Sequence, residues 1–221
     1  MDMNKFYEYF QPDKVKDRIH IIGCGAVGST IAELLVRMGL TKFTLYDFDI
    51  VEPHNIANQM YRQSDIGKKK TDALAGIMME INPDVDIRVK EKYEPGMNFS
   101  GHIFLCVDKI SIRRQFVEEN VNNPSIKTVF DCRIRLADAQ SYAADWSKYD
   151  HRQNLLNSMQ FSDEEADAET PVSACNMTLS VAPTVRQICN YAVSNFINLL
   201  NGKELKKVIL IDAFEHNLMT F

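Results

Sequence analysis

Residues 19–28 read Ile19-His20-Ile21-Ile22-Gly23-Cys24-Gly25-Ala26-Val27-Gly28. A short apolar run followed by three closely spaced glycines predicts a strand, a tight turn and the start of a helix. Glycines in such a turn let backbone N–H groups and a helix N-terminus approach a polyphosphate without obstruction by Cβ atoms. The turn suits ATP, NAD and FAD alike, so by itself it predicts a nucleotide site and no particular reaction.

Strand and helix patterns alternate along the rest of the chain. Helices are expected from the glycine turn to Gly39 and over residues 69–81, 111–121 and 183–200; strands are expected over 43–46, 85–89, 103–107, 128–132, 141–145 and 208–211. Such alternation implies right-handed crossovers. We therefore expect an α/β fold: a Rossmann-like, mainly parallel sheet with helices on both faces and an antiparallel extension after a crossing loop.

The length of 221 residues and the hydrophobic content of 45% are sufficient for one buried core. We expect a single domain over residues 1–221. Residues 147–174 are polar and are expected to form a long, partly mobile crossing loop. The acidic run at 163–169 is interpreted as a solvated face, because blocks of like charge usually stay hydrated.

The composition excludes several functional classes. The 25 basic and 30 acidic side chains give a net charge of −5, which argues against a nucleic-acid or anionic-membrane partner. The chain shows neither a signal-peptide pattern at its start nor an apolar run of membrane-spanning length. These features predict a soluble, cytoplasmic protein.

Five cysteines occur without any CxxC pair, so neither a disulfide framework nor a paired zinc site is indicated, and no zinc is expected. Four of them are interpreted as packing residues: Cys24, Cys106, Cys132 and Cys189.

Two acidic residues follow the second predicted strand. Asp47 lies 24 residues after Gly23, close to the spacing at which an acid accepts hydrogen bonds from ribose hydroxyls. Asp49 follows two residues later. Since ligands bind at the carboxyl ends of parallel strands, both acids are expected to face the glycine turn; the alternative is that they only end a strand and begin a turn.

Further polar residues distinguish the possible reactions. Asn55 and Gln59 are four apart and would project from one side of a helical turn, where neutral amides can hold a phosphate. Lys70 adds a cation after the turn at Gly67, and Asp108, at the end of another strand, adds a carboxylate suited to Mg²⁺. This set favours chemistry at phosphorus over hydride transfer, which needs an apolar slot for nicotinamide.

The order GxGxxG, DxDxV, NxxxQ, GxxK and an apolar strand ending in Cys-x-Asp resembles the ThiF-type adenylyltransferases, to which the ubiquitin-activating enzymes are related. The similarity runs from about Arg18 to Arg135 and, more loosely, from Val181 to Asn201. It implies that the C-terminal carboxylate of a small ubiquitin-like or sulfur-carrier protein attacks the α-phosphate of Mg-ATP, which gives an acyl adenylate and pyrophosphate. It also implies a homodimer.

The resemblance assigns roles to individual residues. Gly23, Gly25 and Gly28 correspond to the nucleotide turn, Asp47 to the ribose ligand and Asp49 to its motif partner. Asn55, Gln59 and Lys70 correspond to phosphate-contacting residues, and Asp108 to the acid on the Mg²⁺ side. Arg113 corresponds to a basic position often found in the helix that follows, and it is expected to bind the cofactor.

The chain departs from the family pattern at several points. Family members usually have arginine directly before the glutamine, whereas this chain has Asn58, and Arg62, Lys68 or Lys69 is expected to substitute. The N-terminal arginine that can reach a partner subunit's ATP in this family has no match in residues 1–16. These departures leave open a catalytically degenerate docking partner of the same fold, and the glycine turn with Asp47 leaves open an NAD-dependent oxidoreductase.

Two further residues have both a functional and a plain interpretation. Cys175 follows the crossing loop where some relatives keep a cysteine, so its thiolate could accept the acyl group, or the side chain could simply pack before a helix. His54 could touch a phosphate, but next to Pro53 it is interpreted as a turn residue.

Overall fold

The structure is a computed structural model that describes residues 1–174 and 178–221. Its centre is an eight-stranded sheet with the strand order β3-β2-β1-β4-β5-β6-β7-β8. The strands are β1 (Ile19–Ile22), β2 (Lys42–Tyr46), β3 (Asp86–Lys90), β4 (Gly101–Leu105), β5 (Ile126–Ile134), β6 (Asp138–Asp145), β7 (Val208–Asp212) and β8 (Asn217–Thr220). The first five strands along the chain pair in parallel and the last three are antiparallel. The predicted Rossmann-like fold with an antiparallel extension is confirmed.

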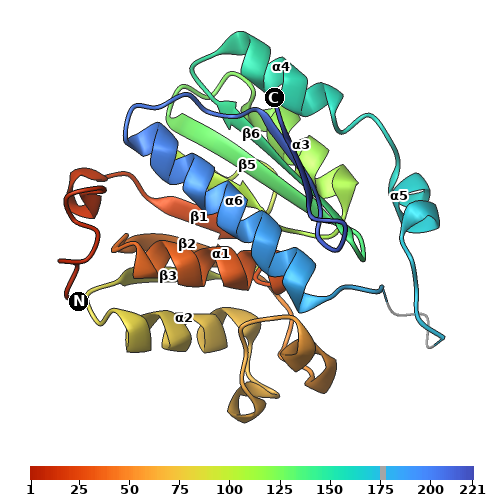
Figure 1. Ribbon diagram of the computed structural model, residues 1–221, viewed down its shortest axis with the longest axis horizontal. Helices are drawn as coiled ribbons and strands as arrows, with labels where there is room; N and C mark the ends of the chain where they lie inside the picture. Colours follow the sequence, from red (N-terminus) through yellow and green to blue (C-terminus); the bar gives the residue numbers. More distant parts are fainter. Residues whose placement is uncertain (175–177) are drawn as a thin grey trace.

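Helices cover both faces of the sheet (Figure 1). They are α1 (Ala26–Arg37), α2 (Lys70–Ile81), α3 (Ile110–Asn120), α4 (Tyr149–Asn157), α5 (Asp163–Glu169) and α6 (Ala182–Leu200), with short 3-10 turns η1 (Pro12–Lys14), η2 (Pro53–Ala57) and η3 (Gln63–Asp65). Side chains of α1, α2 and α6 share one buried cluster, and those of α3 and α4 belong to a second cluster on the other face.

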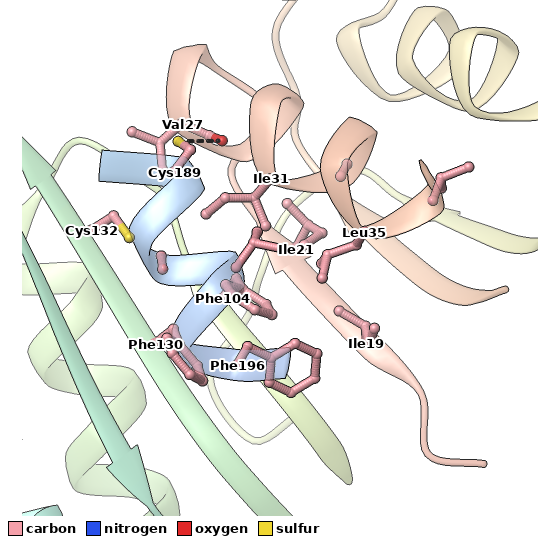
Figure 2. Close-up of a cluster of buried hydrophobic side chains, with 14 of the residues drawn as sticks. Ile19, Ile21, Val27, Ile31, Leu35, Phe104, Phe130, Cys132, Cys189 and Phe196 are labelled. Atoms are coloured by element: carbon pink, nitrogen blue, oxygen red, sulfur yellow. Dashed lines mark hydrogen bonds between the residues drawn. The ribbon is translucent and has the colours of Figure 1, made fainter. Parts of the chain in front are cut away.

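The apolar stripe that Val185, Ile188, Ala192 and Phe196 form at helical spacing along α6 is buried in the core. Phe196 packs edge-on against Phe104 and Phe130, which come from neighbouring strands (Figure 2). Two turns before Phe196 in α6, Sγ of Cys189 lies 3.6 Å from the carbonyl oxygen of Val27 in the first turn of α1. This packing holds α6 against the helix that begins at the glycine turn.

The segment expected to be a polar loop contains two helices. In α4, Leu155 is buried against the second cluster, which explains why this short helix forms. The helix α5 buries no residue, but the Ser162 side chain accepts a hydrogen bond from Glu165 N and the Glu165 side chain accepts one from Ser162 N. Reciprocal bonds of this type satisfy the N–H groups that a helix start leaves free. The loop prediction was therefore wrong for these two stretches.

The acidic helix α5 is solvated but also anchored by polar contacts. Asp163 accepts hydrogen bonds from the backbone and hydroxyl of Ser111, at 3.1 and 2.6 Å. Asp167 pairs with Lys109. Both contacts are made to the start of α3, so α5 lies beside the residues that follow β4.

Two strand predictions also need correction. The strand expected over 103–107 is β4, Gly101–Leu105, because its register with β1 ends where β1 ends at Ile22. The last strand, β8, was not predicted. Its residues are all exposed and lack the apolar alternation of a half-buried strand, and it is connected to β7 through a turn in which His216 has φ 58°.

Candidate active site

The glycine turn lies between the carboxyl ends of β2 and β4. Gly23 N donates to the Tyr46 carbonyl at 2.8 Å on one side, and Cys106 N donates to the Ile22 carbonyl at 2.7 Å on the other. The polar residues that follow β2 and β4 are thereby brought to the two sides of the same turn, at the edge where parallel sheets bind ligands.

Two glycines of the turn are required by packing. Gly23 has φ +94°, and a Cβ there would lie 2.7 Å from the backbone of Cys106. A Cβ on Gly28 would lie 1.9 Å from the Gly23 carbonyl oxygen. Both positions therefore exclude any larger residue, because the obstructing atoms belong to the backbone.

Gly25 differs, because a Cβ there would meet no heavy atom within 4 Å. It precedes α1, which has no side-chain cap and no acidic residue in its first turn. The first N–H groups of α1 therefore face an open space, and such groups favour an anion through both hydrogen bonding and the helix dipole. This observation fits the phosphates of a nucleotide.

Asp47 is held against the turn by two backbone donors. Its Oδ2 accepts from Cys24 N at 2.6 Å and its Oδ1 from Asp49 N at 2.8 Å. Burial is the largest effect on this carboxyl and raises its pKa above the usual range, while the backbone hydrogen bonds oppose that shift. Each oxygen keeps a free lone pair, so the side chain can still accept hydrogen bonds from ribose hydroxyls.

Asp49 and Lys70 form an ion pair beside the turn. Nζ of Lys70 lies 2.7 Å from Oδ2 of Asp49, and Lys70 N donates to the Asp49 carbonyl at 2.9 Å. Lys70 begins α2 and is only 8% exposed. The structure thus brings together two residues that are twenty-one positions apart in the sequence.

Asn55 and Gln59 are in different environments, although Gln59 N donates to the Asn55 carbonyl at 2.9 Å. The Asn55 side chain is buried and its Oδ1 accepts from Glu52 N at 2.9 Å, so it caps η2. Oε1 of Gln59 is buried and has no hydrogen-bond partner among the described residues. A buried amide oxygen of this kind calls for a donor from water or a ligand.

Two residues that were not predicted from the sequence, Tyr61 and Ser29, fix the segment around Gln59. The hydroxyl of Tyr61 donates to the carbonyls of Cys24 and Lys70, at 2.6 and 3.2 Å. The hydroxyl of Ser29 accepts from Met60 N at 3.2 Å. Neither residue belongs to a periodic motif, so no sequence pattern indicates this role.

Asp108 follows β4 and is exposed, with its Oδ1 accepting a hydrogen bond from Lys109 N at 2.9 Å. A single exposed carboxylate fits Mg²⁺, which is typically held by one or two carboxylates together with substrate phosphates and water. Among the described residues no group of three or more candidate ligands is found.

Arg113 lies below this edge, away from solvent. Its guanidinium pairs with Asp131, donates to the Cys132 carbonyl at 2.9 Å and, through Nε, to the Val107 carbonyl at 2.8 Å. Asp131 is fully buried and also pairs with Arg133. In this structure Arg113 therefore fixes the peptide that precedes Asp108, whereas the family resemblance predicts a cofactor-binding role for it.

The described cysteines have no nucleophilic character. Cys24, Cys132 and Cys189 are buried, as predicted for packing residues, and Cys106 is half-buried. Burial raises the pKa of the Cys132 thiol to about 12 and shifts the pKa values of the other three thiols well above the usual range. They are thiols at neutral pH, and it is the thiolate that reacts. The alternative acceptor, Cys175, lies outside the described residues.

His54 is exposed in η2, where its Nε2 lies 3.7 Å from Glu52. This placement confirms that it is a turn residue.

A cavity of about 1030 Å³ lies at the other end of the parallel strands, where they begin. It is lined by residues at the start of β4 and β5 and at the end of α6, among them His102, Ile126 and Leu200. Because nucleotide sites of parallel sheets are found at the carboxyl ends of the strands, we do not assign the nucleotide to this cavity.

The comparisons with known proteins agree with this geometry. The model of the ThiF family matches residues 2–221. The chain therefore belongs to the ThiF family, as the resemblance of its motifs indicated. Within the described part of the chain, none of the helices combines the length and the apolar character that a membrane crossing needs.

Similar curated proteins include ubiquitin-like modifier-activating enzyme 5 of Arabidopsis thaliana, 45% identical over 67 residues, and of Caenorhabditis elegans, 35% identical over 78 residues. The matches cover 30% and 35% of this chain but only 16% and 19% of those proteins. The chain thus matches less than a fifth of the length of these two relatives.

Similar solved structures include Escherichia coli MccB with ATP, with a TM-score of 0.77 and 15% identity, which covers 95% of this chain and 65% of that chain. PaaA has a TM-score of 0.70 and 18% identity, with 93% and 64% covered. At these identities the similarity shows the fold alone.

Proposed function

We propose that the chain is an ATP-dependent adenylating enzyme that acts on the C-terminal carboxylate of a small ubiquitin-like or sulfur-carrier protein. One observation supports this proposal above others: an uncapped helix start, the Asp47 carboxylate held against the glycine turn and the buried Lys70 meet at the carboxyl ends of the parallel strands. The name of the ubiquitin-like modifier-activating relatives supports the class of partner.

In this proposal the α1 N-terminus and Gly25 receive phosphate oxygens, and Asp47 accepts hydrogen bonds from the ribose. Lys70 approaches the α-phosphate as a cation, and Oε1 of Gln59, which has no hydrogen-bond partner among the described residues, accepts a hydrogen bond at the site. Asp108 is the ligand for Mg²⁺, which when bound with ATP would neutralise part of the phosphate charge.

The reaction is an in-line displacement at phosphorus. A carboxylate oxygen of the carrier forms a bond to the α-phosphorus while the bond from that phosphorus to the bridging oxygen breaks, and pyrophosphate leaves with the electron pair. Lys70 and the α1 dipole stabilise the charge that develops on the phosphate oxygens. No proton has to be removed from the attacking carboxylate at neutral pH.

Pyrophosphate exchange tests the proposal. The chain is incubated with MgATP, labelled pyrophosphate and a panel of ubiquitin-like and sulfur-carrier proteins, and label should enter ATP only with a matching carrier. Exchange should disappear in Asp108→Ala and persist in the control Asp150→Ala, which changes an exposed carboxylate on α4. Absence of exchange with every carrier, together with absence of MgATP binding, would contradict the proposal.

A second candidate is a catalytically degenerate docking partner, which Asn58 favours because it removes a cation from the motif. Calorimetry distinguishes the two, since a degenerate module should bind MgATP weakly and micromolar binding would exclude it. A homodimer and a cytoplasmic location belong to the main proposal as well. Sedimentation of the chain at micromolar concentration tests the dimer.

A further inference from the structure

The cations near the glycine turn are mostly paired with acidic side chains. A triphosphate brings several negative charges to its site, and a cation that is already neutralised by a carboxylate attracts it less. Lys70 is paired with Asp49, and Arg113 with the fully buried Asp131. The question is therefore which side chain could add an uncompensated positive charge.

The three residues expected to replace the arginine missing at Asn58 are paired as well. Arg62 lies 2.6 Å from Glu80, Lys68 lies 2.8 Å from Asp65, and Lys69 lies 3.1 Å from Glu91. All three line a cavity of about 370 Å³ beside α2, together with Asp72 and further acidic residues. Their acidic partners lie on α2, in η3 and directly after β3.

Arg186 is different. It is half-buried in the second turn of α6, and it is the only charged residue of that nineteen-residue helix. Its Nη1 lies 2.5 Å from Oγ1 of Thr30 and also contacts Sδ of Met60. Both partners are neutral. Within residues 1–174 and 178–221 no carboxylate forms an ion pair with this guanidinium.

The contacts of Arg186 place it beside the proposed phosphate site. Thr30 lies one turn into α1, the helix that begins at the glycine turn. Met60 directly follows Gln59, whose buried Oε1 has no partner among the described residues. The guanidinium therefore lies where α1 meets the segment that includes Asn58 and Gln59.

The electrostatic surroundings favour an anion at this place. Both α1 and α6 lack an acidic residue in the first turn, and neither start is capped by a side chain. Helix starts are positive, so an arginine close to two of them is in an unfavourable field. An anion bound between the guanidinium and these helix starts would remove that repulsion and form charge-assisted hydrogen bonds.

We propose that Arg186 is a phosphate-binding residue of the ATP site and supplies from α6 the positive charge that Asn58 does not supply next to Gln59. This inference rests on the proposed function. The inference assigns a polyphosphate contact to α6, a helix that lies outside the sequence motifs of the nucleotide turn. The guanidinium has five N–H donors, and the contacts to Thr30 and Met60 are both made by Nη1.

Nucleotide binding to single variants tests the inference. Arg186→Gln should weaken MgATP binding about tenfold to a hundredfold, the size expected for loss of a charge-assisted hydrogen bond, and should leave adenosine binding unchanged. Arg186→Lys should keep part of the affinity. The control Arg37→Gln, which removes an exposed and paired cation from the last turn of α1, should change MgATP binding less than twofold.

A rescue variant makes the test sharper. Adding Asn58→Arg to Arg186→Gln should restore most of the MgATP affinity, because the charge returns to the same region from η2. Equal losses of affinity for ATP and for adenosine in Arg186→Gln would show a merely structural role and overturn the inference. Unchanged MgATP binding in Arg186→Gln, with MgATP binding by the wild type, would also overturn it. If wild type itself binds no MgATP, the proposed function fails and this inference fails with it.

Discussion

Lys70 and Asp49 are joined twice, by a side-chain ion pair of 2.7 Å and by a backbone hydrogen bond from Lys70 N to the Asp49 carbonyl. The lysine is nearly buried, whereas the Asp49 side chain is 49% exposed. The lysine is thus oriented before any nucleotide binds. The exposed side of the pair leaves room for a phosphate to share the ammonium group.

Removal of this lysine charge should affect catalysis far more than folding. Lys70→Met keeps the buried aliphatic stem, so we expect the free energy of unfolding to change by less than about 1 kcal/mol, because a pair with a half-exposed partner contributes little. The rate of pyrophosphate exchange should fall about a hundredfold to a thousandfold, as for loss of one donor that stabilises charge in the transition state. Urea titrations and exchange assays measure the two quantities.

Asp49→Asn is the matched control for this lysine, since it keeps the cation and removes only the partner charge. We expect its exchange rate to fall less than tenfold. Exchange by Lys70→Met at the wild-type rate would show that the ammonium group does not act on the phosphate.

The glycine turn allows packing and ligand binding to be tested separately. Gly28→Ala should destabilise the fold by about 2–3 kcal/mol, because the new Cβ would lie 1.9 Å from a backbone oxygen. Gly25→Ala meets no atom within 4 Å, so the chain should fold normally but bind MgATP at least tenfold more weakly, since the methyl group points into the proposed phosphate space. Thermal melting and calorimetry give the two readouts.

Gly76→Ala in α2 provides the control for Gly25→Ala. No atom lies within 4 Å of its added Cβ, and a helical glycine-to-alanine change should stabilise the protein by about 0.5–1 kcal/mol without altering ATP binding. Wild-type MgATP affinity in Gly25→Ala would show that the open space at this glycine does not hold phosphate.

Much of the fold follows from patterns that are local in the sequence. The apolar run before Gly23 and the helical stripe after it identify β1 and α1, and the spacing to Asp47 identifies the end of β2. These signals are strong because each element buries one face, or both faces, in a single core. The helices α4 and α5 gave weaker signals: each is short, and α5 buries no side chain at all. Its capping box, Ser162 with Glu165, was nevertheless present in the sequence.

The site was harder to predict than the fold. Arg113 has the expected position along the chain, but its guanidinium points to Asp131, which lies on a strand eighteen residues later. The contact of Arg186 with Thr30 spans 156 residues and depends on how α6 packs on α1. No spacing rule can supply such pairings. The isolated charge in an otherwise uncharged helix was a usable signal that Arg186 needs an explanation.

The buried carboxylate of Asp131 should be essential for stability. It is paired with Arg113 and Arg133, so Asp131→Asn would leave two guanidinium groups without their common anion. We expect a loss of about 3–5 kcal/mol in the free energy of unfolding, the range for breaking a buried pair from one side. Urea denaturation measures the loss. The control Asp138→Asn, at an exposed position of β6, should change the free energy of unfolding by less than about 0.5 kcal/mol. An equally small change for Asp131→Asn would refute the role of Asp131 as the common anion of the two arginines.

Two buried histidines should make the protein sensitive to mild acid. Burial lowers the pKa of His20 and of His102 to about 4, whereas in the unfolded chain each has a pKa near about 6.5. Between these values the unfolded state binds the proton and the folded state does not. The stabilisation is therefore fully present above about pH 6.5 and is lost as the pH falls toward 4, by up to roughly 3 kcal/mol for each histidine.

The contribution of His102 can be isolated by substitution. His102→Gln retains a polar group opposite Oγ1 of Thr128, which lies 3.0 Å from the histidine Nδ1, but removes the titration. Its free energy of unfolding should decrease by about 2–3 kcal/mol less than that of wild type between pH 7.5 and 4.5. A wild-type pH profile for His102→Gln would contradict this expectation, because it would show that the ring is already protonated in the folded protein. Urea titrations at half-unit pH steps distinguish the two outcomes.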